Sequence, residues 1–201
     1  MRINQLLEIL NNYYSKNPQH YHTAYHITDM LSVYAHFRDA FCTDIQANTS
    51  LDWEESDNAI VEAIVWHDSA LYDWGDHEHQ SVMLYKAGNP NANDKVINAI
   101  LNTKIVPDGN VNREDVVAKI VRDLDWSYFT EMQRLLDADT KIIYELSDYY
   151  KGVFDKKAIK EKRKEFLESL IGKELFSTYA FQEYEKATQR NIKQLIRQRY
   201  K

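Results

Sequence analysis

Apolar residues recur at helical spacing along almost the whole chain. Ile3, Leu6, Leu7 and Leu10 predict a first amphipathic helix, which Asn17-Pro18 would end. Only five Gly and three Pro interrupt the 201 residues, and no window alternates apolar and polar positions between turn residues. The pattern therefore predicts an all-helical protein without a sheet.

The same spacing places the remaining helices. We expect them over about 23–42, 50–72, 77–87, 93–104 and 113–124, followed by three more, the last over about 180–199. Ser50 or Asp52 would cap the third helix, which would reach Tyr72 and carry His67 and Asp68. Turn sequences at Gly88-Asn89-Pro90 and Pro107-Asp108-Gly109 separate the helices that follow.

Length and composition favour one domain over 1–201. The single Cys42 cannot form an internal disulfide, and no apolar run opens the chain as a signal peptide, so we expect a reducing, cytoplasmic compartment. No apolar stretch approaches the ~20 residues that span a bilayer, which predicts no membrane partner.

Charge is distributed unevenly along the chain, whose net charge is −6. Residues 151–201 carry 14 Lys/Arg against 7 Asp/Glu, whereas residues 1–150 carry 11 against 24. Because the acidic part holds all the histidines, this distribution disfavours a nucleic-acid partner, and we interpret the basic tail as a solvated helix face. The pattern leaves a homo-oligomer open.

Candidate chemistry begins with His67-Asp68, which follow the apolar run Ala63-Ile64-Val65-Trp66. Burying an Asp costs several kcal/mol unless it is paired or bound to a metal. A metal is one resolution, and a hydrogen-bonded pair at a helix end is the other. His22 and His26 lie four residues apart, so they share a face if one helix includes both.

Two carboxylates, Asp123 and Asp125, follow another apolar-patterned run. Together with His26 and His67-Asp68 they offer nitrogen and oxygen ligands from three separated helices. Such a mixed set suits one divalent ion among manganese, iron, cobalt, nickel, zinc and magnesium.

In this order of residues the chain resembles the HD superfamily, and within it the group of predicted metal-dependent HD phosphohydrolases. The resemblance covers nearly the whole chain and implies a single HD-type helical bundle over 1–201, with its core at about 20–130 and C-terminal helices at about 131–201. It rests on Tyr21-His22-x-x-x-His26, Trp66-His67-Asp68-Ser69-Ala70-Leu71-Tyr72-Asp73, Glu78 followed by Ser81, Thr103-Lys104, Asp123-Leu124-Asp125, Phe176-Ser177-Thr178-Tyr179-Ala180-Phe181 and Glu185-x-x-x-x-Arg190-Asn191.

The resemblance implies a phosphohydrolase that cleaves a small phosphorylated substrate, with nucleotides among the candidates, through a metal-activated water. It implies that the metal ligands are His26, His67, Asp68 and Asp125. Asp123 is the alternative for the last ligand, since two residues' separation turns it to a different side of the helix.

Other residues are candidates for work on the substrate. Asp73 and Glu78 could act as general acid or base or orient water, the alternative for each being a helix cap. His22, Thr103 and Lys104 could bind phosphate, the alternatives being a packed His22 and a solvated helix end at Lys104.

The chain also departs from the group. His77 stands where the group has Asn, and Val106 stands where it has His, which predicts a change of specificity. His77 and His79 do not share a helical face, which disfavours a second metal there.

Two other classes of protein remain open. One is a non-catalytic regulatory helical domain that binds metal or a nucleotide. The other is an oxidative HD enzyme with two irons, which would need additional His or carboxylate ligands near the core set. The sequence favours one metal, because extra His residues of the expected spacing are missing after His67-Asp68.

Overall fold

The computed structural model describes residues 3–15, 20–47, 51–70, 76–104 and 115–200. Within these ranges the chain forms helices, turns and loops and no strand, which confirms the all-helical prediction. The elements are α1 (Ile3–Ile9), the π-helix η1 (Leu10–Tyr14), α2 (Ala24–Gln46), α3 (Trp53–Trp66), α4 (His77–Gly88), α5 (Asp94–Asn102), α6 (Val116–Asp125), the 3-10 helix η2 (Trp126–Thr130), α7 (Met132–Tyr149), α8 (Lys156–Ser169), α9 (Tyr179–Gln182) and α10 (Glu185–Arg199).

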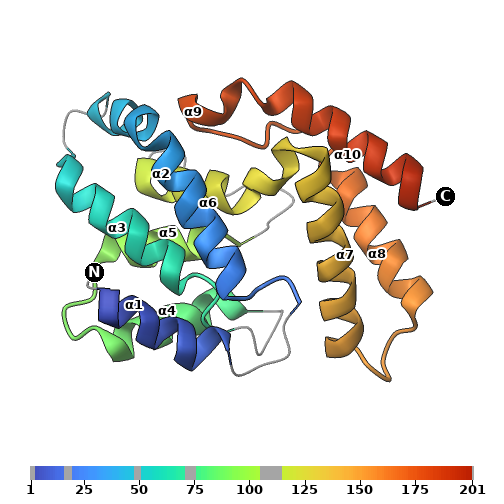
Figure 1. Ribbon diagram of the computed structural model, residues 1–201, viewed down its shortest axis with the longest axis horizontal. Helices are drawn as coiled ribbons and strands as arrows, with labels where there is room; N and C mark the ends of the chain where they lie inside the picture. The colour runs from blue at the N-terminus through green and yellow to red at the C-terminus, as the bar shows by residue number, and fades with distance from the viewer. Residues whose placement is uncertain (1–2, 16–19, 48–50, 71–75, 105–114, 201) are drawn as a thin grey trace.

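The helices form two neighbouring groups in one domain (Figure 1). In the first, α5 packs against α3, α4 and α6, and α2 packs against α3 and α6. In the second, α7, α8 and α10 pack together, with η2 connecting α6 to α7 and touching α10. One hydrophobic core runs through both groups, from Ile60 and Ile120 to Phe129 and Ile192.

Side-chain caps explain where several helices begin. Asp52, Asp115 and Asp155 each accept a hydrogen bond from the backbone N–H three residues later, at 2.8, 3.1 and 2.8 Å. Such caps satisfy an N–H that has no partner inside the helix. Asp52 therefore caps α3, as one of the two predicted alternatives, while Ser50 lies outside the described residues.

Three helix boundaries differ from those predicted. α3 ends at Trp66, because the backbone N–H and the hydroxyl of Ser69 both donate to the Trp66 carbonyl and close a tight turn. His67 and Asp68 thus lie on this turn, and not inside the helix. α2 begins at Ala24, close to the predicted start, but runs to Gln46 instead of about 42; because it begins after His22, His22 and His26 do not share a helix. The last predicted helix is divided into α9 and α10, interrupted at Glu183 and Tyr184.

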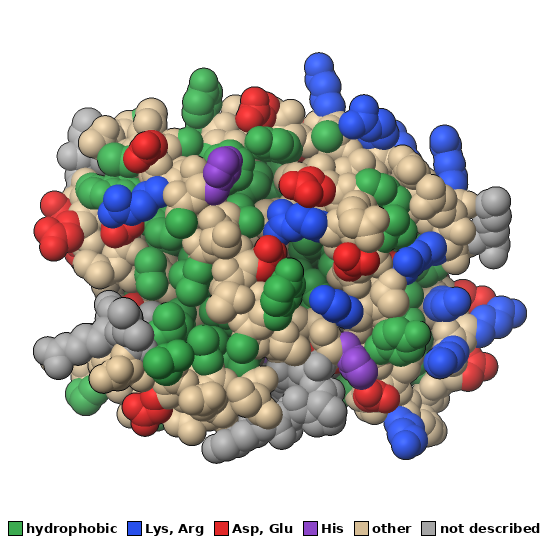
Figure 2. Space-filling view, viewed as in Figure 1, with side chains coloured by type: hydrophobic (Ala, Val, Ile, Leu, Met, Phe, Trp, Pro, Cys, Tyr) green, Lys and Arg blue, Asp and Glu red, His purple; other side chains and the backbone are tan. Residues whose placement is uncertain are grey.

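The basic residues that are concentrated in the C-terminal part of the sequence also lie together in space. Lys and Arg side chains gather over the C-terminal helices α8 and α10, at the right of the view in Figure 2. No helix in the described ranges is both long and apolar enough to cross a bilayer.

Candidate metal centre

The ends of three helices bring four of the predicted ligands together. His26 lies in the first turn of α2, which begins where Thr23 accepts a hydrogen bond from the Tyr25 N–H. His67 follows the last residue of α3, and Asp125 is the last residue of α6. Because α2 packs against both α3 and α6, these ends meet. We call His26, His67, Asp68 and Asp125 the His/Asp cluster.

Distances within the His/Asp cluster are short. The Nε2 atom of His67 lies 2.9 Å from Asp68 Oδ2, and that of His26 lies 3.2 Å from Asp125 Oδ1. The crossed distances are 3.7 Å from His26 to Asp68 and 3.8 Å from His67 to Asp125. One donor atom from each of His26, His67 and Asp68 lies within 4.8 Å of the others, so these three buried residues could hold a metal ion.

The imidazoles are oriented as metal ligands would be. His67 Nδ1 donates to the Ile64 carbonyl at 2.8 Å, which fixes the proton on Nδ1 and turns the lone pair of Nε2 toward the carboxylates. Among the described residues, the buried Nε2 atoms of His26 and His67 lie 3.2 and 2.9 Å from carboxylate oxygens but make no hydrogen bond of acceptable geometry. Because buried polar atoms are nearly always satisfied, these two nitrogens fit a bound cation.

Electrostatics in the His/Asp cluster favours positive charge. Burial lowers the pKa of His67, but Asp68 and Asp125 outweigh it and raise that pKa well above its usual value. Burial alone would raise the pKa of Asp125, yet the adjacent imidazoles of His26 and His67 lower it to about 2. The buried Asp68 and the partly buried Asp125 thus require compensating charge, which protons on the imidazoles or a metal ion supply.

His22 lies beside the cluster, held by Glu145 of α7. The His22 ring contacts Glu145 Oε1 through Nδ1, while its Nε2 lies 3.9 Å from Asp68 Oδ2. The other Glu145 oxygen, Oε2, accepts hydrogen bonds from the backbone N–H groups of His20, Tyr21 and His22, at 3.0, 2.8 and 3.1 Å. Glu145 therefore fixes the segment just before α2 and aims His22 at Asp68.

Asp123 points away from the His/Asp cluster. Its carboxylate accepts hydrogen bonds from the backbone N–H groups and hydroxyls of Ser177 and Thr178, the shortest being 2.7 Å from the Thr178 N–H. Burial raises the pKa of Asp123 to about 6 even though these donors lower it. Asp123 thus ties α6 to the segment before α9, which leaves Asp125 as the carboxylate of α6 that contacts the imidazoles.

α4 brings two further groups to Asp68. Glu78 is 3% exposed, and its Oε1 lies 3.2 Å from His77 Nε2. The same His77 nitrogen lies 3.6 Å from Asp68 Oδ1. His77, which the sequence analysis treated as a departure from the group and disfavoured as a metal ligand, is therefore a neighbour of the cluster. His79 lies apart, half-exposed and paired with Asp76.

The remaining predicted site residues have other contacts. The Thr103 hydroxyl donates to the Ile100 carbonyl at 2.7 Å, and Lys104 Nζ lies 3.5 Å from Asp76 Oδ1. A role for these two residues in binding substrate stays a prediction. Asp73 and Val106 lie outside the described residues.

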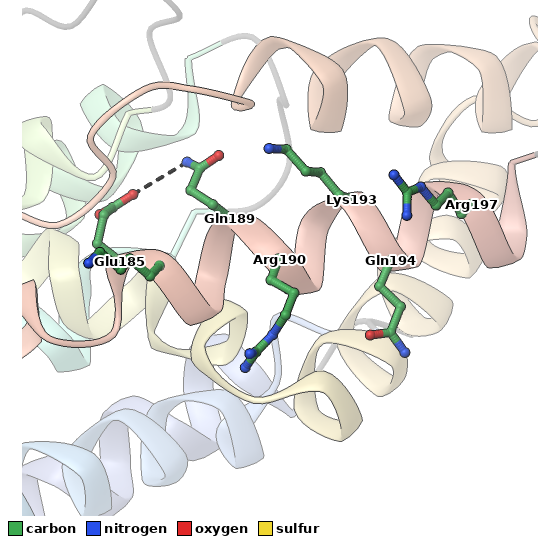
Figure 3. A pocket seen from close by; sticks show the side chains of 7 residues that line it. Glu185, Gln189, Arg190, Lys193, Gln194 and Arg197 are labelled. Atoms are coloured by element: carbon green, nitrogen blue, oxygen red, sulfur yellow. Dashed lines mark hydrogen bonds between the residues drawn. The ribbon is translucent and has the colours of Figure 1, made fainter.

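A surface groove of about 590 Å³ lies far along the chain from the cluster residues (Figure 3). Every residue that lines it comes from α10: Glu185, Lys186, Gln189, Arg190, Lys193, Gln194 and Arg197. A groove lined by one helix cannot enclose a small molecule, and its basic side chains agree with the solvated face predicted for the tail.

Glu145 is the neighbour of the site that sequence reasoning missed. A signal for it exists, because α7 buries Leu135, Ala138, Asp139, Ile142 and Glu145 at helical spacing. Two acidic residues thus occupy core-facing positions, and a carboxylate there needs a partner elsewhere in the fold.

Comparison of the chain with protein families, with curated proteins and with solved structures finds no match.

Proposed function

We propose that the chain is a metal-dependent phosphohydrolase of the HD type, whose divalent ion is held by His26, His67, Asp68 and Asp125. The observation that carries this proposal is the pair of buried Nε2 atoms that face the carboxylates of Asp68 and Asp125 without a well-formed hydrogen bond. A divalent ion at such a site lowers the pKa of water and polarises a phosphoryl oxygen.

The chain's own residues would complete the reaction. His22, fixed by Glu145, presents Nε2 beside Asp68 and can donate a hydrogen bond to a phosphate oxygen. Glu78 is buried next to the cluster, where a carboxylate can accept a proton from the attacking water or orient it. Lys104 would attract the substrate phosphate as a point charge. The substrate class is a small phosphate ester, with nucleotides as the first candidates.

Metal analysis followed by a substrate screen tests the proposal. Protein purified without chelator should contain at least one equivalent of a divalent metal and should release phosphate from nucleotides or sugar phosphates when manganese is added. Bound metal without turnover of any phosphate ester would favour the regulatory, non-catalytic domain. Protein that binds no divalent metal would overturn the proposal.

A further inference from the structure

The carboxylate of Asp68 faces imidazoles on two sides. Its Oδ2 lies 2.9 Å from His67 and 3.7 Å from His26, within the His/Asp cluster. Its Oδ1 lies instead 3.6 Å from His77 Nε2, on the side of α4. An ion in the His/Asp cluster that takes Oδ2 therefore leaves the second oxygen of Asp68 directed at another potential ligand.

His77 and Glu78 complete a donor set on that side. They open α4, and the Oε1 of the buried Glu78 lies 3.2 Å from His77 Nε2. Two donors that each lie about 2.1 Å from one ion are roughly 3.0 Å apart at a right angle and roughly 3.4 Å apart at a tetrahedral angle. Separations of 3.2 and 3.6 Å come close to this spacing without any rearrangement of the backbone.

Charge supports a second cation as well. Asp68, Glu78 and Asp125 carry more negative charge than one divalent ion neutralises, and a net negative site would repel a dianionic phosphate ester. A second divalent ion makes the site net positive, which favours such a substrate. The N-terminus of α4 disfavours a cation by about 0.3–1 kcal/mol, a small effect beside two carboxylates.

We infer that Asp68 Oδ1, His77 Nε2 and Glu78 Oε1 form a second divalent-cation site, with Asp68 bridging two ions. One nitrogen and two oxygen donors suit manganese, iron, cobalt or zinc. Because the sites share Asp68, this inference rests on the proposed metal centre. His77 makes the site specific to this chain, since the group that the chain resembles has Asn at that position and would lack the nitrogen ligand.

The metal stoichiometry of the full-length protein tests the second site. Wild-type protein titrated with Mn²⁺ should bind two equivalents, and its electron paramagnetic resonance spectrum should show the exchange coupling of two bridged ions. His77→Asn should bind one equivalent tightly, weaken the other 10–100-fold and give the spectrum of an isolated ion. His79→Asn, whose side chain lies at the surface beside Asp76, is the matched control and should bind two.

The outcomes separate the two proposals. One equivalent in the wild type, or two tight and coupled equivalents in folded His77→Asn, overturns the second site and leaves the phosphohydrolase proposal standing. No bound manganese in the wild type overturns both. If His77→Asn does not give a cooperative melting curve, Glu78→Gln replaces it as the variant, with the same expected loss of one ion. The metal stoichiometry and the exchange coupling of the wild type then decide together with that variant.

Discussion

Asp123 and Asp125 are two residues apart in α6, yet their carboxylates have different partners. Asp125 contacts His26 and His67, so Asp125→Asn should weaken the metal site itself, and both metal content and turnover should fall. Excess metal should restore part of both. Metal analysis beside a phosphatase assay over a range of manganese concentrations measures this.

Asp123→Asn provides the control for that change. It should retain most of the bound metal but lose on the order of 2–3 kcal/mol of unfolding free energy, because an amide cannot accept all the hydrogen bonds from Ser177 and Thr178. Denaturant unfolding measures the loss. If Asp123→Asn removed the metal and Asp125→Asn kept it, our assignment of the ligand would be wrong.

Glu78 is the residue that we expect to accept a proton from the attacking water or to orient that water. Glu78→Gln should lower turnover by roughly 10²–10⁴-fold, the range for a lost acid or base, and the ion in the His/Asp cluster should stay bound even though the second ion inferred above is lost. The buried position of Glu78 beside His77 gives the reason. Steady-state kinetics with parallel metal analysis checks it, and Glu62→Gln on α3, where Tyr85 donates to the carboxylate, should leave turnover near that of the wild type.

At the level of elements, α7 holds the segment before α2 in place. Glu145→Ala should destabilise the protein by about 2–4 kcal/mol, since three backbone N–H groups and the His22 ring lose their acceptor. Turnover should fall as well, because His22 is no longer aimed at Asp68. Asp137→Asn, on the exposed side of α7, should change the unfolding free energy by less than about 0.5 kcal/mol. Equal effects of both changes would contradict this account.

The C-terminal helices are joined by a buried ion pair. Arg163 of α8 donates to Asp139 of α7 at 3.0 Å, and the Tyr200 hydroxyl after α10 donates to both oxygens of the same carboxylate. Arg163→Met should therefore cost up to about 3–5 kcal/mol, because it leaves the buried carboxylate with only the more distant, partly exposed Arg199, at 3.6 Å, as its cation. Lys157→Met, which removes an exposed partner of Glu161, should cost at most about 1 kcal/mol. Comparable losses in urea unfolding would refute the assignment.

For the whole molecule, a ligand that binds only the folded state must stabilise it. At a free metal concentration of 100 times Kd the gain is about 2.7 kcal/mol, which for a chain of this length raises Tm by roughly 5–10 °C. We expect chelator to lower the Tm of the wild type by that amount. His67→Ala and Asp68→Ala should lower Tm by themselves and should abolish the effect of chelator, as scanning calorimetry can show.

Local features of the sequence predicted most of the helices. Apolar periodicity and capping residues such as Asp52 and Asp115 act over a few residues, so helix content and several helix starts were predicted correctly. The predicted helix boundaries were wrong where a side chain altered the local hydrogen bonding. At Ser69, for example, a side-chain hydrogen bond closes a turn that ends α3 before His67. The group's motif predicted which His and Asp residues ligate a metal, and these residues lie together in the fold.

What surrounds those ligands was decided only by the tertiary structure. Periodicity shows which face of a helix is buried, but it does not show which helix ends meet. Glu145 lies 123 residues from the His22 ring that it contacts, and no local pattern relates the two. His77 shares no helical face with His79 and was set aside on that ground, yet α4 places it beside Asp68, because packing between α3 and α4 joins residues that helical spacing alone cannot relate.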